Sequence, residues 1–353
     1  MRVLSLFDGI SCGMVALERA GIPVERYVAY EINEPSIKIS KKNYPTIEHK
    51  GDVTNADFSE YIGFDLLIGG SPCQDLSGLN TVYRQKGKTG LKGEKSRLFY
   101  AYVDALNTVA PKYFLFENVA SMKAEWRDEI TRELGVEPVM INSALVSAQE
   151  RKRLYWTNIP NVTQPSDKGI VLDDIILSAE KVPEKYWYRG KKYTLNGEDD
   201  RVIATLDGEK IFSENKRVFN PKHKCGTLCG DGAGGNLQKK VYQNGAVRKL
   251  TPLEYERLQT LPDNYTEGAA DSHRYTAVGN GWTVDVIAHI YFIDWDHVRA
   301  RHRQLNVTVM GTTEDVNDRK FHGGQTINTL RKYTDEEKAH DIHYTLQLDA
   351  REF

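Results

Sequence analysis

The stretch Phe64-Asp65-Leu66-Leu67-Ile68-Gly69-Gly70-Ser71-Pro72-Cys73-Gln74 joins a short apolar run to a turn that contains glycine, proline and cysteine. The apolar run predicts a buried strand that ends at Gly69-Gly70. Pro72 restricts the backbone beside Cys73, so the thiol is expected to sit, partly exposed, after a rigid strand. Six Lys and Arg residues follow within 84–97, and nearby positive charge favours a nucleophilic thiolate. The alternative is an inert core cysteine.

Strand and helix signals alternate through the first 120 residues. Apolar runs predict strands at 2–7, 27–30, from 47, 64–70 and 113–116, and helices are predicted at 14–20, 34–43 and 96–109. This alternation predicts βαβ units and a mainly parallel sheet. Polar residues follow the predicted strand ends, where open α/β sheets bind their ligands. These residues are Asp8, Glu31, Asp52, Cys73 and Glu117.

A glycine turn near the N-terminus points to a cofactor. Phe7-Asp8-Gly9-Ile10-Ser11-Cys12-Gly13 joins the first predicted strand to a helix, and backbone N–H groups in such a turn can face a ligand. Glu31 lies near the offset of about 20 residues at which an acid binds a ribose hydroxyl in dinucleotide-binding folds. Together these features indicate an adenosine-containing cofactor. The turn is not Gly-x-Gly-x-x-Gly, and a purely structural turn is the alternative.

Two further motifs carry charged side chains. Phe116-Glu117-Asn118-Val119 ends a predicted strand, and a carboxyl group in apolar surroundings there can donate a proton. Gln149-Glu150-Arg151-Lys152-Arg153 places Arg151 and Arg153 on one face if the segment is extended. A solvated basic edge is the alternative for the second motif.

After about residue 157 the segments shorten and glycine and lysine become more frequent, which predicts an irregular inserted domain. Residues 151–250 hold 19 Lys and Arg against 12 Asp and Glu, although the whole chain has a net charge of −2. This asymmetry indicates either an anionic partner or a solvated surface. Regular structure is expected again from Leu250, where Thr251 can cap a helix that opens with Pro252. Another helix is predicted at 283–293.

The remaining composition excludes several classes of protein. Four cysteines are too few for a disulfide framework in 353 residues. His223, Cys225 and Cys229 are irregularly spaced, so no metal site is expected. No apolar run approaches the ~20 residues of a membrane helix, and the N-terminus lacks the pattern of a signal peptide. A cytoplasmic protein with reduced thiols is expected, and its oligomeric state stays open.

The motifs resemble those of cytosine-5 DNA methyltransferases, in the same order along the chain. They are Phe7-Asp8-Gly9, Glu31, Asp52-Val53, Ser71-Pro72-Cys73-Gln74, Glu117-Asn118-Val119, Gln149-x-Arg151-x-Arg153, Arg248-x-Leu250-Thr251-Pro252-x-Glu254 and Gly279-Asn280. Asp8–Gly13 and Gly70–Ser77 read most like the vertebrate de novo branch. The absence of that branch's long N-terminal region favours a bacterial or phage member, the usual setting of restriction-modification.

The resemblance implies a Rossmann-like S-adenosylmethionine-dependent methyltransferase fold with a smaller inserted target-recognition domain. The expected parts are a catalytic domain at 1–157, the target-recognition domain at 158–247, a return segment at 248–296 and an extension of unknown role at 297–353. Lys and Arg of the middle part are expected to contact DNA phosphates. The candidates are Lys191, Lys192, Lys216, Arg217, Lys222, Lys224, Lys239 and Lys240. Thr227-Leu228 resembles a Thr-Leu pair of such domains.

The resemblance also implies the roles of single residues. The implied catalytic residues are Cys73, Glu117, Arg151, Asn118 and Pro72. The implied S-adenosylmethionine-binding residues are Phe7, Asp8, Gly9, Ile10, Ser11, Gly13, Glu31, Ile32, Asp52, Val53 and Asn280. Cys73 would attack carbon 6 of a cytosine flipped out of double-stranded DNA, because carbon 5 alone is a poor nucleophile. Glu117 would assist at ring nitrogen 3, Arg151 would steady the pyrimidine, and Glu31 would bind the ribose hydroxyls.

Two other readings stay open from the sequence. One is a catalytically dead homologue that only binds DNA, although both Cys73 and Glu117 are present. The other is a different α/β enzyme that uses a nicotinamide or another nucleotide on a small molecule. That reading leaves Pro72-Cys73, Glu117-Asn118-Val119 and the basic middle part unexplained.

Overall fold

The structure, a computed structural model, describes residues 1–72, 91, 98–208, 213–230 and 238–292. Residues 1–293 form one compact unit. Cys73, most of the basic stretch 76–97 and the predicted extension at 297–353 lie outside the described residues. No helix in the described part of the chain is long and apolar enough to cross a membrane.

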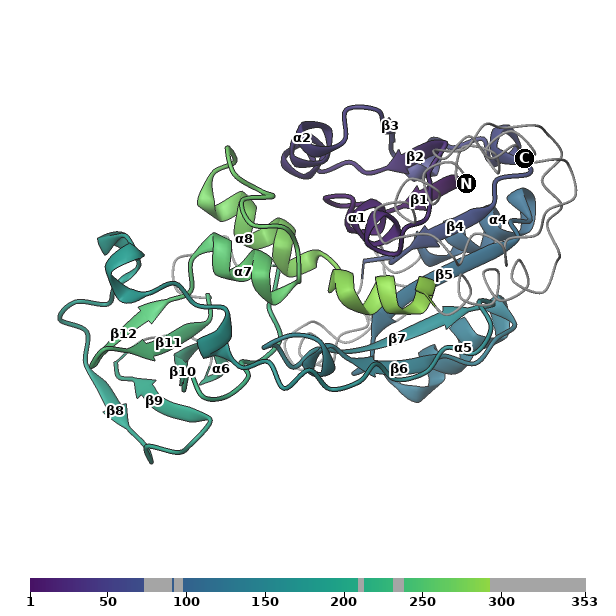
Figure 1. Cartoon of the computed structure of the whole chain (residues 1–353). Helices are drawn as coiled ribbons and strands as arrows, with labels where there is room; N and C mark the ends of the chain where they lie inside the picture. Colours follow the sequence, from purple (N-terminus) through teal and green to yellow (C-terminus); the bar gives the residue numbers. More distant parts are fainter. Residues whose placement is uncertain (73–90, 92–97, 209–212, 231–237, 293–353) are drawn as a thin grey trace, which may run out of the picture. The chain divides into compact units, whose positions relative to one another are not determined.

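A seven-stranded sheet forms the larger part of the fold (Figure 1). Its order is β3 (Glu48–Gly51), β2 (Arg26–Tyr30), β1 (Arg2–Leu6), β4 (Leu66–Gly69), β5 (Tyr113–Val119), β7 (Lys152–Thr157) and β6 (Val139–Asn142). The strands from β3 to β5 pair in parallel, and β7 runs antiparallel to both of its neighbours. The predicted mainly parallel sheet is therefore confirmed, while β6 and β7 were not predicted.

The strand register aligns the chemically important residues. Leu6 pairs with both Tyr30 and Gly69, and Gly69 pairs with Phe116. The residues that follow these four positions therefore emerge at the same carboxyl edge of the sheet. They are Phe7, Glu31, Gly70 and Glu117.

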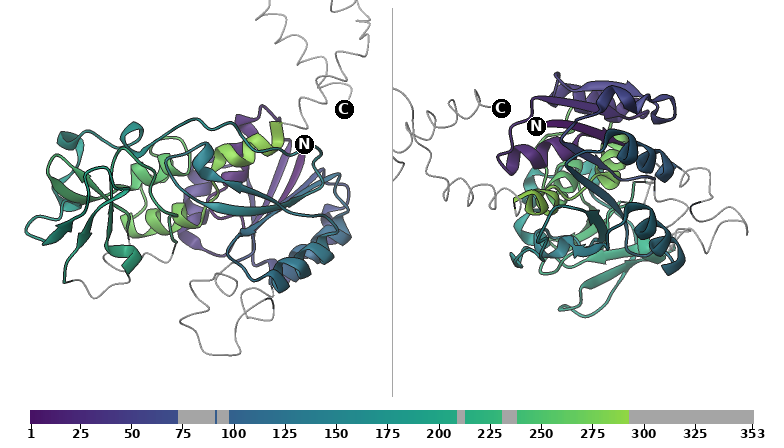
Figure 2. Two further views of the ribbon diagram at one scale, coloured as in Figure 1. Left: turned by 90° about the horizontal axis from the view of Figure 1, so that it is seen from below. Right: turned by 90° about the vertical axis from the view of Figure 1, so that its right-hand side faces the viewer.

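Helices cover both faces of this sheet (Figures 1 and 2). Helices α4 (Phe99–Val109) and α5 (Ala124–Leu134) lie on one face, and α1 (Cys12–Arg19) lies with the helical residues 284–292 on the other. Helix α2 (Glu34–Asn43) has its predicted bounds, because the Asn33 side chain accepts a hydrogen bond from the Ser36 backbone N–H and caps it.

Aromatic packing holds the central strands in place. The Phe116 ring lies 5.3 Å from Phe99, 4.8 Å from Tyr102 and 5.9 Å from Trp156, measured between ring centroids. All four side chains are fully buried. Such packing keeps β5 rigid up to the residue before Glu117.

A second, five-stranded sheet has the order β12 (Ala246–Lys249), β11 (Lys240–Gln243), β10 (Arg217–Phe219), β9 (Val202–Leu206) and β8 (Tyr193–Leu195). Its core is small, with Ala204, Leu206, Val218 and Val247 buried together. Three to five residues per strand give too short a pattern to be recognised in the sequence. The four-residue helix α6 (Ser213–Lys216) precedes β10.

The chain then returns to the first sheet. Helix α7 (Pro252–Leu258) begins as predicted, because Thr251 and Glu254 form a reciprocal capping box. Helix α8 (Asp271–Asn280) was not predicted. The remaining described helices are the 3₁₀ turns η1 (Val53–Asn55), η2 (Phe58–Tyr61), η4 (Ser143–Leu145), η5 (Leu172–Asp174), η6 (Ala179–Lys181) and η7 (Glu184–Tyr186).

Candidate active site at the carboxyl edge of the parallel sheet

Glu31 ties together two loops at this edge. Its Oε2 accepts a hydrogen bond from the Gly9 backbone N–H at 2.8 Å, and its Oε1 accepts from the Ile32 and Asn33 backbone N–H groups. Gly9 has a φ of +61°, a conformation that glycine adopts without strain. A carboxylate has about four lone-pair directions, and three of those of Glu31 are used here, so Glu31 can still accept one bond from a ribose hydroxyl.

The Asp8 carboxylate bonds to side-chain hydroxyl groups, whereas that of Glu31 bonds to backbone N–H groups. Asp8 accepts hydrogen bonds from three hydroxyl groups, those of Ser5, Tyr27 and Ser11. Burial raises the pKa of Tyr27 well above its usual value, and the Asp8 charge adds to that shift, so Tyr27 stays a hydrogen-bond donor. The half-buried Asp8 carboxylate is thus engaged by these hydroxyl groups, and it shapes the turn.

The other residues implied at the cofactor differ in exposure. Ile32 is 69% exposed beside Glu31, whereas Ile10, Ser11, Gly13 and Val53 are buried. Phe7 is half-buried with a φ of +59°. Asp52 caps η1 by accepting a bond from the Thr54 backbone N–H at 2.9 Å. An acceptor for ribose hydroxyls and an exposed aliphatic side chain for a flat base are chemically suited to an adenosine group.

Glu117 has a partner for each carboxylate oxygen. Arg153 Nε lies 2.7 Å from Oε1, and Trp282 Nε1 donates to Oε2 at 3.1 Å. The side chains of Arg153 and Glu117 are only 12% and 11% exposed. The strand register explains the ion pair, because Arg153 faces Val119 on β5, two residues from Glu117 and on the same face. The expectation of apolar surroundings for Glu117 is therefore wrong, because a guanidinium and an indole N–H contact its carboxylate.

Sequence reasoning gave no role to either partner of Glu117. The motif Gln149-x-Arg151-x-Arg153 points to Arg151 as the site residue and gives Arg153 no task of its own. Trp282 lies between Gly281 and the predicted helix, and nothing in its local sequence marks it. Both contacts depend on segments distant from Glu117 along the chain.

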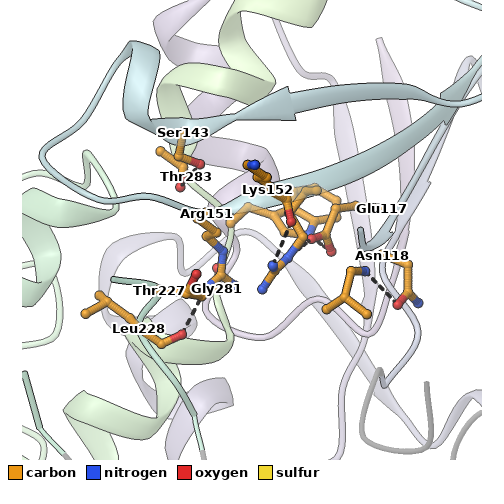
Figure 3. A network of polar contacts seen from close by, with 12 residues as sticks. Glu117, Asn118, Ser143, Arg151, Lys152, Thr227, Leu228, Gly281 and Thr283 are labelled. Carbon is orange, nitrogen blue, oxygen red and sulfur yellow. Dashed lines mark hydrogen bonds and ion pairs between the residues drawn. The ribbon is translucent and has the colours of Figure 1, made fainter. Parts of the chain in front are cut away.

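Arg151 is buried and donates to two backbone carbonyls. Its guanidinium bonds to the oxygens of Leu228 and Gly281, both at 3.1 Å (Figure 3). The neighbouring Gln149 accepts from the Leu228 backbone N–H at 2.8 Å. Arg151 therefore joins the start of β7 to the Thr227-Leu228 segment and to the return segment.

Asn118 fixes the start of the loop that leads to Cys73. Its Nδ2 donates to the Ser71 carbonyl at 3.3 Å, and its Oδ1 accepts from the Val119 backbone N–H. A methyl group on Gly70 would lie only 3.0 Å from Glu117 Oε2, so the loop passes directly beside the acid. Pro72 is half-buried at the end of the described segment. The candidate nucleophile Cys73 itself lies outside the described residues.

Asn280 lies against a different segment from the one expected. Its exposed side chain occupies the space that a Cβ atom on Gly230 would need. The contacts with the predicted cofactor loop come instead from its neighbours: a methyl group on Gly281 would lie 3.1 Å from Cys12 Sγ, and one on Gly13 would lie 3.7 Å from Trp282 Cζ3.

Two described cysteines are poor nucleophiles. Burial raises the pKa of both Cys12 and Cys225 to about 12, against smaller lowering effects of the Trp282 backbone N–H and of Lys239 respectively. Both thiols are therefore protonated at neutral pH. Among the described residues no group of three His, Cys, Asp or Glu is arranged to hold a metal ion, and His223 bonds to the Asp199 carbonyl.

Three of the lysines expected at DNA phosphates lie inside the protein. Lys224 Nζ donates to the carbonyls of Ala144, Ser147 and Ile170. Lys239 and Lys240 are buried. Lys191, Lys192, Arg217 and Lys222 are exposed. Net charge along the sequence did not distinguish lysines that stabilise the fold from those available to a partner.

The chain is similar to known methyltransferases in sequence and in fold. Orphan methyltransferase M.Rho11sI of Bacillus phage rho11s is 31% identical over 279 residues, 69% of this chain and 52% of the relative. The chain thus spans about half the length of that protein. Type II methyltransferase M1.ScrFI of Lactococcus lactis subsp. cremoris is 25% identical over 81% of this chain and 76% of its own length.

The methyltransferase EhMeth of Entamoeba histolytica has the same fold, with a TM-score of 0.63 and 17% identity over 84% of this chain and 98% of that one. The Rossmann-like methyltransferase architecture expected from the sequence is thereby confirmed. A family model described as C-5 cytosine-specific DNA methylase matches residues 1–292. The chain belongs to the C-5 cytosine-specific DNA methylase family.

Proposed function

We propose that this protein is a DNA (cytosine-5)-methyltransferase that acts on double-stranded DNA, with S-adenosylmethionine supplying the methyl group. The observation that carries the proposal is the arrangement around Glu117. The acid lies at the carboxyl edge, is held by Arg153 and Trp282, and borders the Gly70 turn that leads to Pro72-Cys73. Family membership of residues 1–292 supports the same reaction.

Each residue has a task in this reaction. The Cys73 thiolate adds to carbon 6 of the cytosine, which makes carbon 5 nucleophilic enough to take a methyl group. Glu117 bonds to ring nitrogen 3 and the exocyclic amine and delivers a proton to nitrogen 3, which neutralises the negative charge that thiolate addition puts on the ring. After methylation, water takes the carbon 5 proton, Cys73 leaves as the thiolate and nitrogen 3 returns its proton to Glu117, which restores the aromatic ring.

Several groups prepare the site for these steps. Asn118 holds Ser71 and so positions the loop that carries the nucleophile. Arg151 donates hydrogen bonds to the Leu228 and Gly281 carbonyls, and these bonds hold its guanidinium in place beside the site. Glu31 and Ile32 would hold the adenosine part of the cofactor, with Phe7, Asp52, Val53 and the Gly9 turn around it. The base must leave the helix stack to reach this edge, at a cost of a few kcal/mol.

The test is methyl transfer from labelled S-adenosylmethionine to methyl-free genomic DNA made by amplification. Cys73→Ala is expected to abolish transfer and to keep DNA binding within a few-fold, because it removes only the covalent step. Full activity of Cys73→Ala would contradict the mechanism, and an inactive wild-type protein that binds DNA would favour the catalytically dead homologue. Calorimetry with S-adenosylmethionine and NAD separates the proposal from a nicotinamide enzyme.

The proposal extends to the setting of the protein. The curated relatives named above come from a phage and a bacterium, which supports action in the cytoplasm of a bacterial or phage-infected cell. Sequencing of methylated sites in cells that express the protein would reveal its target.

A further inference from the structure

Trp282 contacts two parts of the site that carry different chemistry. Its indole N–H donates to Glu117 Oε2 at 3.1 Å. At the other end of the ring, Cζ3 lies 3.7 Å from the position of a Cβ atom on Gly13, in the first turn of α1. The preceding residue lies against Cys12 in the same turn, since a methyl group on Gly281 would be 3.1 Å from Cys12 Sγ. One side chain thus lies between the acid and the predicted cofactor loop.

The residues on both sides of Trp282 are held in place. The Gly281 carbonyl accepts from Arg151 at 3.1 Å and from Gln259 at 2.9 Å. The Thr283 hydroxyl donates to Gln259 Oε1 at 2.7 Å and accepts from Ser143 at 2.9 Å (Figure 3). Because both neighbours are fixed by buried hydrogen bonds, the indole has little freedom to follow Glu117 if the acid moves.

The space around the contact is also restricted. A methyl group on Gly70 would lie 3.0 Å from Glu117 Oε2 and 3.2 Å from Trp282 Nε1. A methyl group on Gly13 would overlap Ile68 and lie 3.0 Å from the Tyr27 hydroxyl. Glycine at both positions lets the indole approach the acid and the loop together.

We infer that Trp282 is a positioning residue, which sets the orientation of the Glu117 carboxylate and couples it to the α1 turn at the cofactor loop. The inference deepens the proposed function and rests on it for the role of Glu117. Arg153 fixes Oε1, and the indole N–H fixes Oε2, so the carboxylate plane is set before the base arrives. A shift of the α1 turn would be passed to the acid through the indole ring.

The first test needs no activity. Protein labelled with ¹⁵N-tryptophan gives indole N–H resonances, and the Trp282 signal is assigned by its loss in Trp282→Phe. Glu117→Gln should move this signal upfield, because a charged acceptor makes a stronger bond than a neutral one. S-adenosylhomocysteine added without DNA should also move it. A Trp282 signal unaffected by both changes would overturn the inference.

The second test separates positioning from stability. Trp282→Phe keeps an aromatic ring but removes the indole donor and shortens the side chain, so kcat on methyl-free genomic DNA should fall roughly tenfold while KM for DNA changes much less. Trp187→Phe is the matched control, since its indole N–H donates to the Val182 carbonyl away from Glu117. If Trp282→Phe does not fold, Trp282→Tyr takes its place.

The outcomes distinguish the inference from the proposed function. Equal activity of wild type, Trp282→Phe and Trp187→Phe would overturn the inference and leave the methyltransferase proposal standing. A wild-type protein without methyl transfer would overturn the proposed function, and the resonance measurements would still decide whether Trp282 is coupled to Glu117.

Discussion

Arg153 Nε lies 2.7 Å from Glu117 Oε1, although the two residues come from strands that run in opposite directions. The antiparallel β7 brings the Arg153 guanidinium beside the acid near the carboxyl end of β5. Both side chains are almost nine-tenths buried, so water can solvate the charge of either residue only poorly if its partner is removed.

Removal of this cation should impair the reaction. Arg153→Ala is expected to lower kcat roughly 100-fold, because the acid loses the group that orients Oε1. Single-turnover methylation at saturating DNA measures the effect. Lys152→Ala, at the adjacent exposed residue, is the control and should stay within about twofold of wild type. Activity of Arg153→Ala equal to that control would contradict a role for the ion pair.

The fully buried pair Arg248–Glu254 should matter for stability. Both side chains are 0% exposed, with Nη2 and Oε1 2.7 Å apart. Glu254→Gln leaves a buried guanidinium without its counter-charge, so the free energy of unfolding should fall by about 3–5 kcal/mol. Asp263→Asn tests the exposed Arg257–Asp263 pair and should cost about 0–1 kcal/mol. Urea unfolding measures the free energy of unfolding of both variants, and equal losses in the two would contradict this prediction.

Gly279 should not tolerate a side chain. A Cβ atom there would overlap the Cys229 carbonyl and lie 2.9 Å from the Gly230 backbone nitrogen. Gly279→Ala is therefore expected to destabilise the protein by about 1–3 kcal/mol, since backbone atoms must move apart. Gly226→Ala is the comparison, because its methyl group would make ordinary contacts at 3.6 Å and 3.7 Å. Thermal unfolding of the two variants should separate them, and matching midpoints would refute the close approach.

His49 should make stability depend on pH. Burial lowers the pKa of His49 below its usual value, and its Nε2 lies 3.1 Å from Ser40 Oγ, which contacts Ser11 in the cofactor turn. The unfolded chain takes up this proton at about pH 6.5, whereas the folded protein does so only at lower pH. This contribution is therefore complete above pH 6.5 and is lost as the pH falls through the folded pKa.

Urea unfolding at pH 7.5 and pH 5.5 measures this effect. His49→Gln should lose less stability between the two values than wild type does, because it removes the titrating group. His273→Gln, at an exposed position, should keep the wild-type difference. An unchanged pH dependence in His49→Gln would show that His49 does not contribute.

The sequence located the edge of the site because strands and turns are local features. Apolar runs that stop at Glu31 and Glu117 were enough to place both residues at one edge of a parallel sheet. The Arg153 contact could not be found in this way, because it depends on the direction and register of β7. Trp282 reaches Glu117 from 165 positions further along the chain, and no local periodicity reports such a contact.

The misjudged lysines have a similar cause. Lys224 has the positive charge that a DNA-binding residue needs, yet its ammonium group donates hydrogen bonds to three backbone carbonyls. Whether a lysine faces solvent or a ring of carbonyls depends on tertiary packing, which charge counts do not contain. The cap at Thr251, by contrast, is predicted correctly, because Thr251-Pro252 is a local signal for the start of a helix.

The bonds from Arg151 to Leu228 and Gly281 have an engineering consequence. A main-chain oxygen is the same in every amino acid, so this junction does not depend on which side chains surround it. Under the proposed function, a foreign recognition module could be grafted in place of the five-stranded sheet without redesign of Arg151, provided that it keeps the backbone path of residues 228–230 and a residue without a side chain at position 230.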